Sequence, residues 1–161
     1  MASQNSTLFA SQLTNPQGHV DYASGQSIAD STEAGGRPVI VADTYLTTSA
    51  VTAGSQTITL CKLPAGAKVT SLELIVPASV GTSSAKIGYG TIGVTGTVTV
   101  VDDDRWGSGK DLSSAGRVQF VTVAADADYL TTTEVAVVLS PVTTNFATAI
   151  TFAFIITYVT A

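Results

Sequence analysis

The fold is decided by the stretch Ile150-Thr151-Phe152-Ala153-Phe154-Ile155-Ile156-Thr157-Tyr158 near the end of the sequence. Side chains in a β-strand point alternately to its two faces. The even-numbered residues therefore form one strongly apolar face, and the odd-numbered residues form a second face of Thr, Ala and Ile. Because neither face carries a charge, this strand is predicted to lie in the centre of a sheet or in an interface.

Other strands are expected along the chain from Pro38 onward, where Thr and Val, residues that favour strands, are abundant. Leu63-Pro64-Ala65-Gly66 predicts a turn that leads into a strand ending at Val76. A strand over Val135–Leu139 is predicted to stop at Ser140-Pro141. Further strands are predicted at 39–45, 56–62, 84–91, 96–101 and 117–123. With no amphipathic helix among them, these strands predict an all-β fold, an antiparallel β-sandwich or jelly-roll-like domain.

The first part of the chain, residues 1–36, differs from the rest. It is rich in Ser, Gln, Asn and Gly, and Phe9 and Tyr22 are among its few large apolar residues. Such a segment cannot bury enough apolar surface to fold alone. We therefore predict an extended polar N-terminal arm over 1–36 and a β-sandwich domain over 37–161. Fully extended, the arm spans on the order of 120 Å, enough to cross a neighbouring subunit, although it can also fold back on its own domain.

The composition limits what the surface can bind. Only 12% of the 161 residues are charged and 45% are hydrophobic. Either part of the surface is covered by other protein, or Thr and Ser give a neutral surface. The net charge of −5 disfavours nucleic-acid and acidic-membrane partners, since both require clustered Lys and Arg. Without a secretory signal or a long apolar stretch, the chain is expected to be made in the cytoplasm.

No residue pattern indicates catalysis, a cofactor or a metal. The single cysteine, Cys61, lies in an apolar run and is predicted to be a small buried side chain. The single histidine, His19, lies in the polar arm, which offers no rigid scaffold for a catalytic group. The consecutive carboxylates Asp102–Asp104 lack the alternating spacing of a calcium loop. They are predicted to form a solvated turn, with one of them paired to Arg105 or Lys110.

Two motifs have a structural and a functional interpretation. Gly88-Tyr89-Gly90-Thr91-Ile92-Gly93 matches the dinucleotide-binding pattern G-x-G-x-x-G, but a strand-like sequence follows where that motif requires a helix. These glycines are instead expected at a bend or a close approach of strands. Trp106, the only tryptophan, is predicted to lie in a loop, where it either anchors a subunit contact or closes one end of the core.

Several short motifs, taken in order, resemble a group of tailed-bacteriophage virion proteins. They are Leu63 to Val69, Ser84 to Tyr89, Asp103 to Trp106 and the final strand from Thr151 to Tyr158. The resemblance covers roughly residues 38 to 160. It implies a β-sandwich head protein of the decoration (cement) type, commonly trimeric, with no active site.

The main hypothesis is therefore a non-enzymatic protein of the virion that decorates and stabilises a phage capsid. Its expected partners are the major capsid protein and further copies of itself, arranged as a trimer. The predicted contact residues are Phe9, Tyr22, Arg105, Trp106, Phe152 and Phe154. The alternative is a tail or fibre module that binds host glycans through Trp106, Tyr89, Tyr129 and the Asp cluster.

Overall fold

The computed structural model describes residues 2–5, 38–77, 80, 83–121 and 130–160. Their regular structure is entirely β, and among them no helix is long and apolar enough to cross a membrane. The strands are β1 (Ala2–Asn5), β2 (Val39–Leu46), β3 (Gln56–Leu63), β4 (Ala67–Val76), β5 (Ser84–Ile92), β6 (Val98–Asp111), β7 (Gly116–Gln119), β8 (Val135–Pro141) and β9 (Thr151–Thr160).

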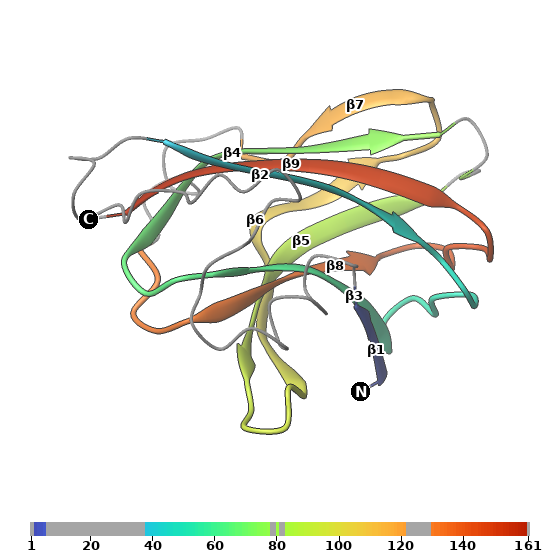
Figure 1. The fold of residues 1–161 in the computed structure, drawn as a ribbon. Coiled ribbons are helices and arrows are strands. Elements are labelled where there is room, and N and C mark those ends of the chain that lie inside the picture. Colours follow the sequence, from blue (N-terminus) through green and yellow to red (C-terminus); the bar gives the residue numbers. More distant parts are fainter. Residues whose placement is uncertain (1, 6–37, 78–79, 81–82, 122–129, 161) are drawn as a thin grey trace, which may run out of the picture.

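The strands form two sheets that pack face to face (Figure 1). One sheet has the order β2-β9-β4-β7 and is antiparallel throughout. The other has the order β1-β3-β8-β5-β6, with four antiparallel strands and β1 added in parallel beside β3. The predicted antiparallel β-sandwich is confirmed.

Strand β9 occupies the central position that its sequence predicts. It pairs with β2 on one side and β4 on the other. Its even-numbered side chains Phe152, Phe154 and Ile156 are buried between the sheets, whereas Ala153 and Ile155 on the other face are half-buried. The second sheet therefore covers only the face of β9 that carries Phe152, Phe154 and Ile156.

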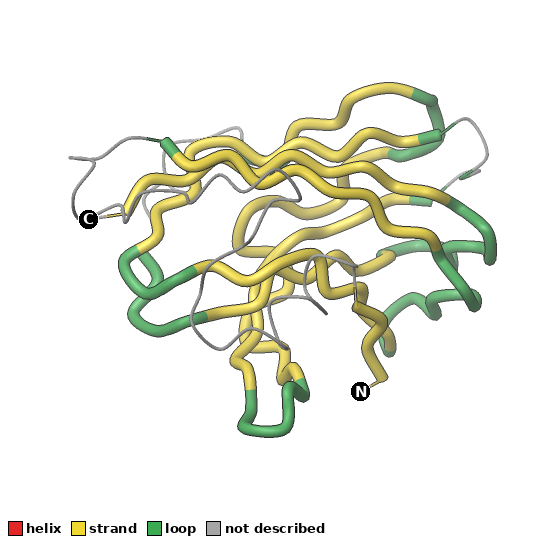
Figure 2. The backbone as a smooth tube through the Cα atoms, viewed as in Figure 1, coloured by secondary structure: helices red, strands yellow, loops and turns green. Residues whose placement is uncertain are grey.

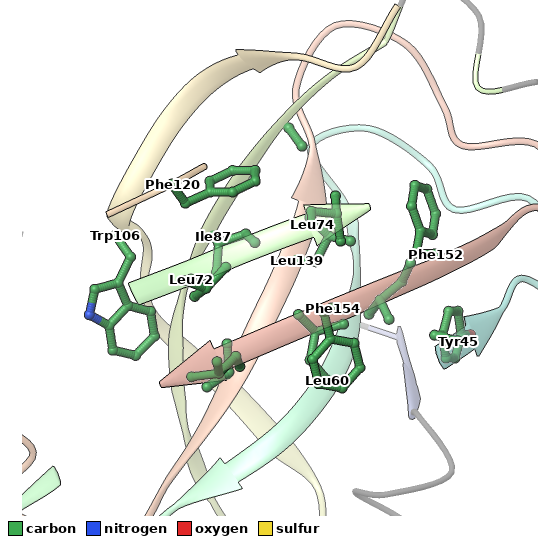
Figure 3. Close-up of a cluster of buried hydrophobic side chains, with 14 of the residues drawn as sticks. Tyr45, Leu60, Leu72, Leu74, Ile87, Trp106, Phe120, Leu139, Phe152 and Phe154 are labelled. Atoms are coloured by element: carbon green, nitrogen blue, oxygen red, sulfur yellow. The ribbon is translucent and has the colours of Figure 1, made fainter. Parts of the chain in front are cut away.

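The core between the sheets is built from large side chains of both layers (Figure 3). Phe152 and Phe146 contact each other with ring centroids 5.0 Å apart, a tilted aromatic pair. Phe120 and Trp106 fill the region beside Leu72 and Ile87. One continuous cluster thus joins the two sheets.

The prediction was wrong in the region after Val101, where a loop was expected. Asp102–Asp104, Arg105 and Trp106 all belong to β6, which runs to Asp111. Asp and Gly are poor strand formers, so local propensity pointed to a turn. Pairing with β5 overrides that propensity, helped by three register irregularities between the strands. Asp103 forms an ion pair with Lys86 at 2.6 Å, a partner that the sequence did not indicate, and the pairing of an Asp with Arg105 or Lys110 stays a prediction.

Two smaller differences concern strand boundaries. The strand predicted at 117–123 is the shorter β7, which ends at Gln119. Strand β8 continues through Pro141, beyond the expected stop at Ser140. The pairing of Ala2–Asn5 with β3 was not predicted. Residues 6–37 lie outside the described residues, so the division into a 1–36 arm and a 37–161 domain stays a prediction.

Cys61 is fully buried in the core, as predicted. Burial raises the pKa of its thiol far above the usual value, and the negative charge of Asp43 raises it further. We expect a thiol reagent to modify the native protein about 1,000-fold more slowly than the denatured chain, because modification requires opening of the core. A labelling time course in buffer and in denaturant measures this ratio; rapid stoichiometric labelling in buffer would contradict it.

Candidate assembly surface

The hairpin formed by β5 and β6 is the part of the described structure that extends farthest from the sandwich. Its connecting turn projects at the lower edge of the view, beyond both sheets (Figures 1 and 2). The turn, residues 93–97, is closed by hydrogen bonds from the Gly93 N–H to the Thr97 carbonyl oxygen, 2.8 Å, and from the Gly96 N–H to the Gly93 carbonyl oxygen, 2.8 Å. Gly96 has a φ of 78°, which a glycine adopts without strain.

The base of this hairpin is held by close contact between its two backbones. A Cβ atom at Gly90 would lie 2.6 Å from the Thr99 carbonyl oxygen. At Gly88 it would overlap the Asp102 carbonyl oxygen and lie 2.6 Å from the carbonyl carbon of Asp103. The prediction that these glycines mark a close strand approach is confirmed, and the match to a dinucleotide motif is accidental.

A second, smaller apolar cluster fixes the hairpin on the outer face of β8. Val98 packs there with Ala136 and Val138, and the half-buried Ile92 and Val100 lie against them. This cluster is separate from the main core between the sheets. Backbone contact and side-chain packing thus hold in place the two strands that carry the turn.

The turn itself is uncharged and carries an exposed apolar side chain. No charged residue occurs from Gly88 to Val101. Val94 has a relative exposure of 110%, the highest among the exposed large hydrophobic residues of the described chain. Beside it, the hydroxyl groups of Thr95 and Thr97 form a hydrogen bond, with their oxygens 3.0 Å apart. A fully exposed valine on an anchored hairpin is a candidate contact for an apolar surface of another protein.

The carboxylates at the base of the hairpin interact with a lysine of β5 and with one another. Asp103 pairs with Lys86, and a side-chain hydrogen bond with Asp102 raises the pKa of Asp104. Burial and the negative charges of Asp102 and Asp103 raise it further, while Lys86 opposes them. Among the residues that the structure describes, no group of three or more His, Cys, Asp or Glu side chains could hold a metal ion.

The structure corrects three of the contact residues predicted from the sequence. Trp106, Phe152 and Phe154 are fully buried in the core and cannot touch a partner of the folded chain. Arg105 is half-buried on β6 and stays a candidate contact. Phe9 and Tyr22 lie outside the described residues, as does His19.

Of the aromatic residues predicted for a glycan site, the two that the structure describes do not lie together on the surface. Tyr89 packs on Trp106 with ring centroids 6.2 Å apart, and both belong to the core region. Their rings therefore stabilise the sandwich and do not form an exposed platform. Tyr129 lies outside the described part of the chain.

Sequence reasoning missed Val94, although the signal was present. An apolar residue between Gly93 and Gly96, at the junction of two predicted strands, indicates a hairpin turn with an exposed valine. Val94 becomes a candidate contact only once the projection of the hairpin is known.

The described residues define a two-layer β-sandwich, antiparallel except for β1, with a projecting β5–β6 hairpin. No protein-family model and no curated protein sequence matches the chain. Among solved structures, the chain is similar to one titled "Capsid of Ralstonia phage GP4", with a TM-score of 0.63, 19% identity, and coverage of 78% of this chain and 86% of that chain. It is also similar to one titled "Cyanophage Pam1 capsid asymmetric unit", with a TM-score of 0.56, 17% identity, and coverage of 88% and 98%. At these identities the likeness concerns the fold.

Proposed function

We propose that this chain is a non-enzymatic structural protein of a phage virion, which decorates the capsid and stabilises it by binding the major capsid protein and neighbouring copies of itself. The observation that carries the proposal is the sandwich shared with chains of two phage capsid structures along most of their length. The low content of charged residues, 12%, supports a surface that is partly covered by protein.

The turn of the β5–β6 hairpin is the proposed contact with the capsid lattice. Its projection lets it reach a neighbouring surface before the body of the sandwich does (Figure 2). The exposed Val94 loses unfavourable hydration when an apolar pocket covers it. The anchored base limits the conformational entropy that the turn loses on binding, which favours affinity.

Val94→Asp is expected to lower the affinity for capsids at least about 10-fold, because docking would bury an unpaired carboxylate. The measurement adds purified protein to heads assembled without it and quantifies the copies bound per head after sedimentation. The melting temperature should stay close to that of the wild type, since Val94 contacts no core residue.

Val142→Asp is the matched control, because Val142 is also an exposed valine outside the hairpin. It should bind heads like the wild type. Equal binding by the Val94 and Val142 variants would show that the turn is not the contact. Failure of the wild-type protein to bind heads at all would overturn capsid decoration itself.

A further inference from the structure

The outward face of β2 and β9 is unusual for the solvent side of a sandwich. Cross-strand pairs from Ile40–Thr157 to Leu46–Thr151 place the even-numbered residues 40–46 beside the odd-numbered residues 151–157. We call these positions the β2–β9 outer face. None of them is charged, whereas the solvent side of an antiparallel sheet is normally polar.

The same face carries exposed apolar side chains at both ends of β2. Ile40 is 58% exposed and Leu46 is 53% exposed. Between them lie the small exposed residues Ala42 and Thr44. The charged residues of this sheet's outward side lie on β4 and β7, next to this face: Glu73 on β4 is the cross-strand partner of Ile155 and pairs with Arg117 on β7 at 2.8 Å. The β2–β9 outer face is therefore a continuous neutral area at one side of the sheet.

We infer that this face binds a second copy of the same chain, sheet against sheet. Each copy carries a net charge of −5, so two copies repel each other wherever their charged surfaces meet. A neutral face allows them to approach without that repulsion. Two such faces can stack at about 10 Å, the spacing at which sheets pack inside a sandwich. The contact is isologous, because the same face is used by both copies.

The size of the face sets the expected strength. With strands about 4.8 Å apart and about 3.3 Å per residue, the two strands that form the β2–β9 outer face cover roughly 250 Å². Two copies together then cover roughly 500 Å², well below the range of about 1,200 to 2,000 Å² that stable complexes bury. The dimer is therefore weak in solution. The local concentration of copies on a particle strengthens it.

Sedimentation equilibrium of the full chain from about 10 µM to 1 mM tests this inference, a range chosen for a weak interface. We expect the weight-average mass to rise with concentration. Added salt should lower the dissociation constant, because it screens the repulsion between like-charged copies. A strictly monomeric chain up to the highest concentration would overturn the inference, and so would an association that salt weakens.

Ala42→Lys places a charge on the exposed part of the face and is expected to raise the dissociation constant at least about 10-fold, since two like charges then approach in the contact. Val142→Lys is the control with the same charge change away from the face. If both variants self-associate equally, a different surface joins the copies.

The inference extends the proposed function, and the two can fail separately. Val94→Asp should lose binding to heads and keep self-association. Ala42→Lys should lose self-association and keep binding to heads when few copies are bound per head. Loss of head binding by Ala42→Lys with unchanged self-association would assign this face to the capsid protein and overturn the second copy as its occupant.

Discussion

Gly88→Ala is expected to destabilise the protein by about 3 kcal/mol, at the upper end of what overpacking costs. The added Cβ would overlap the Asp102 carbonyl oxygen and lie 2.6 and 2.7 Å from the carbonyl carbon and Cα of Asp103. All three atoms belong to the backbone, so no side-chain rotation relieves the contact. Strand β6 would have to separate from β5 there, which loses ladder hydrogen bonds and the packing that depends on them.

Urea unfolding followed by far-UV circular dichroism measures this effect. Gly93→Ala is the matched control, because a Cβ there lies at the ordinary distance of 3.4 Å from the Thr97 carbonyl oxygen. It should change the unfolding free energy by less than about 1 kcal/mol. Thiol labelling gives a second readout, since Cys61 should react faster in Gly88→Ala than in the control. Equal stability of the two variants would show that β6 does not approach β5 closely at Gly88.

Strand β9 explains why the fold class could be read from the sequence. Its alternation of Phe and Ile with Thr and Ala is set by its own side chains, and the burial of Phe152, Phe154 and Ile156 follows that pattern. The strands that pair with it, β2 and β4, have similar local signals. Where the local pattern and the tertiary pairing agree, the sequence alone predicts the strand and its buried face.

Strand β6 is the opposite case. Its run from Asp102 to Gly109 resembles a loop, and only pairing with β5 makes it a strand. The sequence contains a hint in Gly88 and Gly90, which indicate a close approach but not the segment that approaches. The loop prediction also left open whether Trp106 anchors a subunit contact or closes one end of the core, because the pairing that buries it was not known.

The candidate surfaces depend on arrangement more than on residue type. Val94 becomes a candidate contact because the hairpin projects, and Ala42 because its outward neighbours on β9 are also uncharged. Large aromatic residues are enriched in interfaces in general, but in this chain the large aromatic residues predicted as contacts on the described strands are needed for the core. Composition alone therefore does not locate a contact surface, and the arrangement of the strands shows which exposed surfaces are uncharged.

Trp106→Ala is expected to lower the unfolding free energy by about 3 to 5 kcal/mol, the usual cost of removing a buried aromatic side chain. The indole is fully buried, and it contacts Tyr89 at a centroid distance of 6.2 Å. Because a domain is typically stable by about 5 to 15 kcal/mol, this loss is a large part of the total. The melting temperature should fall by about 10 °C or more.

Far-UV circular dichroism is the suitable measurement for this variant, because Trp106 is the only tryptophan and its fluorescence is lost with it. Trp106→Phe should recover part of the stability, since a smaller ring still fills part of the site. Both variants should then be tested for glycan binding below their melting temperatures. A buried indole predicts no change in binding at equal folded concentration. A variant that kept wild-type stability but altered glycan binding would place the indole on the surface, and would revive the glycan-binding module that its burial argues against.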